Sequence, residues 1–188
     1  MLRELTILFA VLAAGAVAGI LSARLAADVP ALSGTVEAGA WRAWPDAGVA
    51  DAMPYARLRY LVDSALPPSP VDRLELVAET DDEGRALSSD CSYTLTGRMM
   101  PVRYWILAVH ASGDGNRPVS SLQAADALHE PDATLVIRVS RRPQPGNWLR
   151  LPEDNNVRLV LNLFGISPLE REKILKARPF TIRREGCS

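Results

Sequence analysis

The sequence predicts a mainly β fold: an antiparallel β-sandwich or jelly-roll-like domain with one or two flanking helices, preceded by one N-terminal transmembrane helix. Three observations lead to this prediction. Short segments rich in β-branched and aromatic residues follow one another between Gly, Pro and Asp turns. No repeat with a fixed period is present. Near the N-terminus, residues 5–23 contain no charged side chain.

The uncharged segment divides the chain into a predicted anchor (1–27), a linker (28–40) and a β-rich domain (41–188). A helix of about 20 residues crosses a bilayer core of ~30 Å, so residues 5–23 can just span it. A cleaved signal peptide is the alternative; we favour the uncleaved anchor because Arg24 and Leu25 disrupt the small-residue cleavage pattern. One arginine on each side leaves the orientation open.

The first elements after the linker are an aromatic pair and a helix. Trp41 and Trp44 can either lie at lipid headgroups or pack onto the domain, and we favour packing. Apolar residues at helical spacing predict a helix over residues 51–66. Pro54 is tolerated in the first turn of this helix, and Pro67 and Pro68 end it.

The remaining chain is predicted as strands joined by turns. Cys91–Thr96 and Val102–Val109 are expected to form a central hairpin around Gly97 and Pro101. A capping box at Ser167 predicts a helix to about residue 176. Residues 122–128 form one helical turn or none, and residues 141–148 are a predicted loop. Four further strands are predicted at residues 71–80, 134–139, 157–164 and 180–183.

Two cysteines, Cys91 and Cys187, are predicted to form a disulfide, with two unconnected thiols as the alternative. Closing a loop of ~100 residues is worth up to ~4.7 kcal/mol on the loop-entropy model. A disulfide requires an oxidising compartment, so it places the domain in the periplasm or outside and the N-terminus inside.

Several kinds of chemistry are not indicated. With 21 basic and 22 acidic residues, the chain has no charge excess for binding nucleic acid. No cofactor motif or metal-ligand spacing is found; His110 and His129 are isolated and expected at the surface, and 81–83 lacks the alternating ligands of a calcium loop. We therefore expect no metal and no cofactor. Glu75, Glu79 and Asp90 are candidate glycosidase carboxylates, but we favour solvated charges.

One polar and aromatic set is a candidate ligand-binding site: Tyr93, Arg103, Trp105, Asn147 and Trp148. Trp148, beside a Pro-Gly loop, could form a stacking wall for a sugar or another flat ligand. The alternative, which we favour, is a tryptophan core cluster next to a structural asparagine.

Motifs in order resemble a bacterial family, the domain of unknown function 1214, over about residues 41–187. The motifs are Asp51-x-x-Pro54-Tyr55-Ala56-Arg57, Glu79-Thr80-Asp81-Asp82-x-Gly84, Cys91-x-Tyr93-x-Leu95-x-Gly97, Pro101-x-Arg103-Tyr104-Trp105, Pro145-Gly146-Asn147-Trp148-Leu149 and Arg184-Glu185-Gly186-Cys187. The family also occurs as the C-terminal half of larger envelope proteins that carry domain of unknown function 1254. The resemblance implies an all-β, jelly-roll-like domain in the cell envelope and implies no reaction. Tyr104 stands where a second tryptophan is expected, which weakens an aromatic platform.

Two functions follow as hypotheses. The first, which we favour, is a single-pass inner-membrane protein whose periplasmic β-domain is a non-catalytic structural module or binds a glycan, a lipid or an envelope protein. The second is a hydrolase acting on envelope carbohydrate, which requires a cleft with two carboxylates about 5–10 Å apart.

Overall fold

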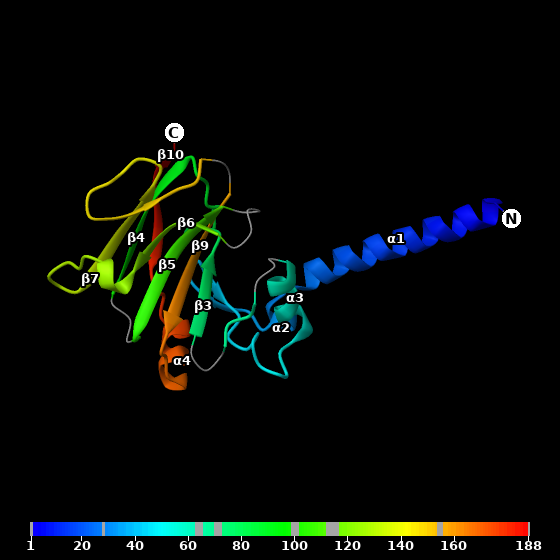
Figure 1. Ribbon diagram of the computed structural model, residues 1–188, viewed down its shortest axis with the longest axis horizontal. Helices are drawn as coiled ribbons and strands as arrows, with labels where there is room; N and C mark the ends of the chain where they lie inside the picture. The colour runs from blue at the N-terminus through cyan, green and yellow to red at the C-terminus, as the bar shows by residue number, and fades with distance from the viewer. Residues whose placement is uncertain are drawn as a thin grey trace.

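The protein is a two-sheet β body with one long helix projecting from it (Figure 1). The computed structural model describes residues 2–27, 29–62, 66–69, 73–98, 102–111, 117–153 and 156–187. Four α-helices are present in these ranges: α1 (Leu2–Ala27), α2 (Pro30–Ser33), α3 (Pro54–Val62) and α4 (Pro168–Lys176).

Helix α1 is exposed along its length, and its main contacts within the described residues are with α2 and α3 at its base. Residues 3–26 have a mean hydropathy of 2.3 in their most apolar window and are long enough to cross a membrane. A signal sequence near an N-terminus has the same length and composition, so the helix is a possible span.

The larger sheet is antiparallel and has the order β1-β2-β3-β9-β5-β6. Its strands are β1 (Val36–Ala38), β2 (Trp41–Ala43), β3 (Arg73–Ala78), β5 (Tyr104–Ala111), β6 (Pro118–Gln123) and β9 (Val157–Phe164). A 3₁₀ turn, η1 (Ala124–Asp126), follows β6. The late strand β9 lies between β3 and β5, so its two pairings join distant parts of the chain.

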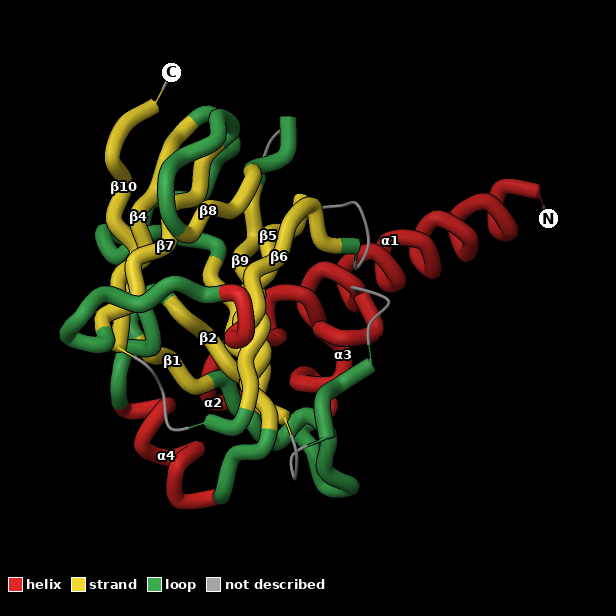
Figure 2. Tube along the Cα trace, turned by 60° about the vertical axis from the view of Figure 1, so that its left-hand side comes forward, coloured by secondary structure: helices red, strands yellow, loops and turns green. Residues whose placement is uncertain are grey.

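The smaller sheet has the order β10-β4-β7-β8. Its strands are β4 (Cys91–Arg98), β7 (Thr134–Ser140), β8 (Asn147–Arg150) and β10 (Thr181–Cys187). Figure 2 shows this sheet beside the larger one, with β10 and β4 at the left. The pair β7–β8 is parallel, whereas the sequence predicts antiparallel pairs and a loop at β8.

The inner faces of both sheets share one hydrophobic core. Leu76 and Leu161 of the larger sheet and Leu95 and Ile137 of the smaller sheet have no exposed surface. Every second residue along each strand points inward, and these side chains from the two sheets fill the space between the sheets.

The outer face of the larger sheet carries a second, smaller apolar cluster. Val77 and Val160 on that face pack against α3 and the segment before it, through Trp44, Ala56 and Tyr60. Trp41 belongs to the main core, where its indole donates a 2.7 Å hydrogen bond to the Phe180 carbonyl. Both tryptophans pack onto the domain, as favoured from the sequence.

The predicted central hairpin is wrong. β4 and β5 are both strands, but β4 pairs with β10 and β7, whereas β5 pairs with β6 and β9 in the other sheet. Gly97 lies within β4, where a Cβ atom would clash with the Pro179 carbonyl oxygen and the Phe180 ring. The absence of a side chain at Gly97 permits this close approach of the chain, and Gly97 does not form a turn. Pro101 lies outside the described residues.

Other predicted elements agree in type and differ in extent. The predicted helix over 51–66 is α3, and residues 63–65 lie outside the described residues. The capping box at Ser167 is present at the start of α4, with hydrogen bonds in both directions to Glu170. Val36–Ala38, within the predicted linker, forms the first strand of the larger sheet.

His110 is buried inside the larger sheet, in contrast to the expected surface position. Burial, and then the charge of Arg158, lower the pKa of His110, so the ring is neutral at pH 7. Neutral histidine fits a buried position on an apolar strand because it avoids placing an unpaired charge there.

Candidate functional site

A polar groove runs along the outer face of the smaller sheet. It lies at the end of the sheet where a disulfide joins β4 to β10. It consists of two adjoining hollows of about 590 and 410 Å³. The residues that line both hollows are Ser92, Ser140, Gln144 and Glu185. We call the combined depression the arginine groove because Arg138, Arg141, Arg142 and Arg183 line it.

The floor of the arginine groove is set by strand register. Thr94 of β4 is opposite Arg183 of β10 on one side and Arg138 of β7 on the other. Arg138 is in turn beside Trp148 of β8. Four neighbouring strands therefore present arginine, threonine, arginine and tryptophan in one row across the sheet.

These side chains face outward because of the two-residue period of a strand. Their neighbours along the chain, Tyr93, Ile137, Val139 and Ile182, are at most 2% exposed and belong to the core. The apolar core residues therefore fix which face of the sheet carries the polar row.

Two arginines and one carboxylate interact on this floor. Arg183 donates hydrogen bonds of 3.1 and 2.9 Å to Glu185. Hydrogen bonds from Arg183 and then Thr94, together with the charges of Arg183 and Arg138, hold the pKa of Glu185 below its ordinary value. Glu185 is therefore ionised at neutral pH. Arg138 donates to the Pro145 carbonyl at 2.9 Å, which holds its guanidinium beside the 141–146 loop.

Arg141 holds the wall of the groove together. Its guanidinium donates to the Ser89 hydroxyl at 3.0 Å, to Asp90 at 2.9 Å and to the Glu153 carbonyl at 2.6 Å. These three contacts join loops on both sides of β7. Arg141 is therefore a structural clamp as well as a charge in the groove.

The 141–146 loop and Trp148 are attached to the same point of β7. The Ser140 hydroxyl donates to the Arg142 carbonyl at 2.6 Å, and the Trp148 indole N–H donates to the Ser140 hydroxyl and carbonyl at 3.1 and 3.2 Å. Trp148 is half-buried, so part of its ring is held in place while part is accessible. The side chains of Arg142 and Gln144 are exposed on the loop.

The disulfide closes one end of the arginine groove. Cys91 and Cys187 are directly opposite each other in the β4–β10 pair, with their Cα atoms 3.8 Å apart, and both line the larger hollow. The disulfide predicted from the sequence is thus present in the structure, and it fixes the end of β10 to the groove floor.

The groove is suited to binding an anionic, oxygen-rich ligand. Four guanidinium groups and two carboxylates line it, so its net charge is positive in a chain that is nearly neutral overall. Arginine binds carboxylate and phosphate groups through paired N–H donors. Within the described ranges, no group of three or more His, Cys, Asp or Glu side chains has the geometry of a metal site.

The five ligand-binding residues predicted from the sequence lie at separate places. Tyr93 and Trp105 are 2% and 4% exposed and belong to the core, although Tyr93 also borders the groove. Asn147 is buried, and its side-chain amide makes three hydrogen bonds to the backbone of Leu128 and Val136.

The other two predicted residues are on opposite sheets. Arg103 is exposed directly before β5 of the larger sheet, where its side chain packs against Gly165. Trp148 lies on the outer face of the smaller sheet, next to Arg138. The structure therefore brings the edge of Tyr93 to the groove and places Trp148 beside Arg138 of the groove floor, and it does not place the other three there.

Sequence reasoning missed Thr94, Arg138 and Arg183, the residues that form the groove floor. Each has a signal within a predicted strand, because each occupies the polar phase of an alternating pattern. The signal does not identify a site by itself, since it requires knowing that β4, β7 and β10 are neighbours.

Comparisons with known proteins identify a family and a fold. A family model described as "Protein of unknown function (DUF1214)" matches residues 72–168. No curated protein matches the chain. The fold is similar to that of an uncharacterized protein from Burkholderia cenocepacia, with 24% identity, a TM-score of 0.50, and coverage of 67% of this chain and 33% of that one.

A second solved structure, the VPA0106 protein from Vibrio parahaemolyticus, is 15% identical with a TM-score of 0.57. The match covers 72% of this chain and 36% of that one. The chain thus spans about a third of the length of both solved structures. At these identities the likeness shows a shared fold.

Proposed function

The chain belongs to the DUF1214 family of proteins of unknown function. We propose from its geometry that it is a membrane-anchored binding module of the cell envelope. Its ligand is an acidic saccharide held in the arginine groove. The observation that carries this proposal is the row of Arg183, Thr94, Arg138 and Trp148 across four strands.

The row combines the two kinds of contact that an acidic sugar requires. Arg138 and Arg142 supply guanidinium donors for a carboxylate or phosphate group, and the half-buried indole of Trp148 supplies a flat apolar surface for a sugar ring. Thr94, Ser92 and Gln144 add hydroxyl and amide groups that can bind sugar hydroxyls. A neutral or purely apolar ligand would offer these guanidinium groups no charge-assisted hydrogen bond.

The proposed cellular location is the periplasmic side of the inner membrane. Helix α1 would be the anchor, and the disulfide supports an oxidising compartment for the β body. In Figure 1, α1 leaves from the side of α2 and α3, whereas β4, β7 and β10 lie on the opposite side. This arrangement supports a groove that faces away from the bilayer.

We also propose that the body is a β-sandwich of jelly-roll-like type, separated from the predicted anchor (1–27) by the predicted linker (28–40), whose residues Val36–Ala38 form β1 of the larger sheet. The core shared by the two sheets supports the sandwich. The insertion of β9 between β3 and β5 supports a jelly-roll-like connection, because Greek keys also return a late strand beside an early one.

A hydrolase acting on envelope carbohydrate is the second candidate, because Asp90 and Glu185 both line the groove. Each carboxylate is ion-paired, Asp90 with Arg141 and Glu185 with Arg183. A glycosidase acid must be protonated near neutral pH, whereas the pKa of Glu185 is lowered. We therefore favour binding without turnover.

The test is calorimetry of the full chain in nanodiscs with oligogalacturonate, a uronic-acid oligosaccharide, and with maltohexaose as the uncharged counterpart. We expect binding of oligogalacturonate alone, weakened by added salt. Arg138→Gln should reduce the affinity about tenfold or more, since a charge-assisted hydrogen bond contributes ~1.5–3 kcal/mol.

The matched control is Arg103→Gln, which removes an exposed arginine from the other sheet and should leave the affinity unchanged. Equal losses for the two variants, or equal binding of maltohexaose, would contradict the groove assignment. Release of shortened oligogalacturonate during the titration, detected by mass spectrometry, would favour the hydrolase.

A further inference from the structure

The helices that contact the base of α1 carry exposed apolar side chains. Five large apolar side chains on α2, on α3 and in the segments beside them are 42–88% exposed: Val29, Leu32, Met53, Leu61 and Leu66. We call these five residues the collar. We propose that the collar lies in the headgroup region of the bilayer that α1 crosses, so that the β body rests on the membrane surface.

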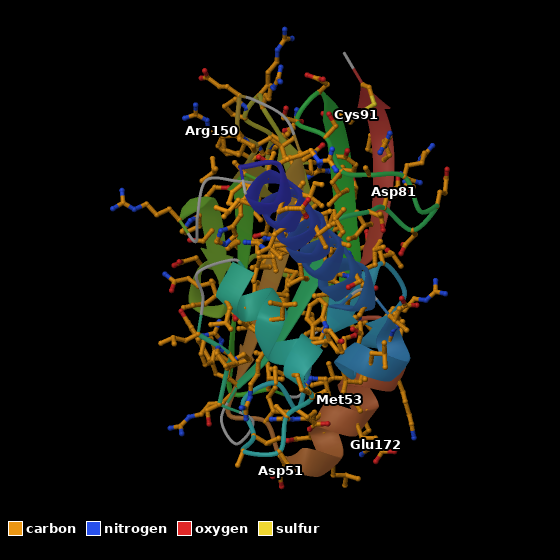
Figure 3. The ribbon with its side chains drawn as sticks, turned by 90° about the vertical axis from the view of Figure 1, so that its right-hand side faces the viewer. Asp51, Met53, Asp81, Cys91, Arg150 and Glu172 are labelled. Atoms are coloured by element: carbon orange, nitrogen blue, oxygen red, sulfur yellow. A yellow bond between two sulfur atoms is a disulfide. The ribbon has the colours of Figure 1, made fainter. Side chains whose placement is uncertain are left out.

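The first argument is the shortness of the connection. Helix α1 ends at Ala27 and α2 begins at Pro30. A residue spans at most ~3.6 Å of extended chain, so α2 cannot move far from the end of α1. Both α2 and α3 contact α1 and each other. Figure 3, which looks at the side from which α1 projects, shows α2 and α3 on either side of it.

The second argument is the length of α1. At ~1.5 Å per residue, 26 helical residues are about 39 Å long, while the hydrocarbon core is ~30 Å thick. If residues 5–23 span the core, Arg24 enters the headgroup layer and the last turn of α1 ends within it. The collar, attached to that last turn, is then at the depth of the headgroups.

The third argument is the contrast with the rest of the body. Single exposed apolar residues are ordinary on protein surfaces, and Leu128 and Leu169, 65% and 63% exposed, are of this kind. Four of the five collar residues, all except Leu66, instead lie on or directly beside α2 and α3, the two helices that contact the base of α1. Such a group on a soluble surface marks a contact site, and here the adjoining helix is itself apolar enough for lipid.

The collar is firmly joined to the β body. Ala56 and Tyr60 of α3 pack with Trp44 against Val77 and Val160 of the larger sheet. Contact between the collar and lipid would therefore set the orientation of the whole body. The arginine groove, on the other sheet, would be held away from the bilayer surface.

The inference rests on the anchor of the proposed function, and the experiment separates the two. The full chain is reconstituted in phosphatidylcholine–phosphatidylglycerol vesicles and exposed to a diazirine reagent that partitions into the bilayer. Mass spectrometry then locates the modified residues. We expect modification of α1 and of the peptides that contain Leu32, Met53 and Leu61, with at least fivefold less on those containing Leu128 and Leu169.

Variants sharpen the test at positions where folding is not at risk. Leu61→Glu should reduce labelling of the α3 peptide several-fold, because a carboxylate at the 72%-exposed position favours water. Leu169→Glu is the matched control and should leave all collar labelling unchanged. An intact disulfide in both variants, seen by mass spectrometry, verifies that the body is folded.

Three outcomes would overturn the inference, and they differ from one another. Labelling confined to α1, with the chain resistant to carbonate extraction, would retain the anchor and remove the collar contact. Extraction by carbonate without labelling of α1 would remove both. An unlabelled collar together with a dimer mass in native mass spectrometry would assign the collar to a second copy of the chain.

Discussion

The outer faces of the two sheets are used in opposite ways. On the larger sheet, Val77 and Val160 are 3% and 7% exposed because α3 and the segment before it cover them. On the smaller sheet, Arg138 and Arg183 are exposed beside Thr94, and none of the helices in the described ranges covers them. Both inner faces serve the same core, so the outer faces are free to differ. One is covered by α3 and the segment before it, and the other is exposed to solvent.

One loop joins the two regions directly. Residues 79–85 follow β3 of the larger sheet and reach β10 of the smaller sheet. There the Asp82 amide N–H donates to the Ile182 carbonyl, and the Asp82 carboxylate accepts from the Ile182 amide. Asp81 is 1% exposed, and its carboxylate Oδ2 is 3.2 Å from the guanidinium Nε of Arg184 in β10. The edge strand β10 is therefore held by this loop on one side and by the disulfide at its end.

The largest effect is expected from breaking that disulfide. Replacing both cysteines, Cys91→Ser with Cys187→Ser, should lower the free energy of unfolding by about 2–5 kcal/mol. Hydrogen exchange should increase first in β10 and β4, because the bond constrains that edge, while β3 and β9 change less. Thermal unfolding of the oxidised wild-type chain with and without reductant is the control. Equal increases in both sheets would show that the two regions unfold as one unit.

A smaller effect is expected at the bridging loop. Burial raises the pKa of Asp81, but hydrogen bonds from the Arg85 amide and guanidinium outweigh it, so the pKa is below its ordinary value. Asp81→Asn leaves buried donors with a weaker acceptor and should cost about 1–3 kcal/mol. Because the folded-state pKa is the lower one, the contribution of Asp81 is complete above the unfolded value of ~3.9 and is lost as the pH falls through the folded value.

The measurement for Asp81 is chemical denaturation of the wild-type chain and Asp81→Asn between pH 7 and pH 3. The difference between them should shrink at the acid end. Asp132→Asn is a control, because Asp132 also has a lowered pKa but its carboxylate accepts hydrogen bonds from Thr134 within one exposed turn. A difference that stays constant with pH would mean that the charge of Asp81 does not contribute.

The last prediction compares the outer faces directly through an isosteric exchange, and it includes the smallest expected effect. Val77→Thr places a hydroxyl under α3 and should cost about 1–3 kcal/mol. Thr94→Val, on the uncovered sheet, should change the free energy of unfolding by less than about 0.5 kcal/mol. Both are measured by urea denaturation. Similar costs at the two positions would contradict the view that only one outer face is covered.

The existence of most strands could be predicted from the sequence because their alternation is local. Apolar and polar residues alternate in β4 and β7, and their buried residues are those that the pattern predicts. The capping box of α4 and the disulfide were also predictable, since each depends on a few residues with specific chemistry.

The pairing of strands could not be predicted in the same way. β4 and β5 are neighbours in sequence and have suitable patterns, yet they belong to different sheets. The reason is that alternation tells which side of a strand is buried and does not tell which strand lies beside it. The arginine groove depends on three such pairings, so Arg138 and Arg183 could not be recognised together. Trp148 was recognised because an indole beside a turn is unusual by itself.

The position of β9 has a consequence for how the chain folds. β3 and β5 are synthesised well before β9, but each pairs with β9 and not with the other. Until residues 157–164 are available, both strands present unsatisfied backbone edges and apolar faces, which attract wrong partners. Folding should therefore be slow for a chain of this size, and the nascent protein should depend on chaperones during that interval.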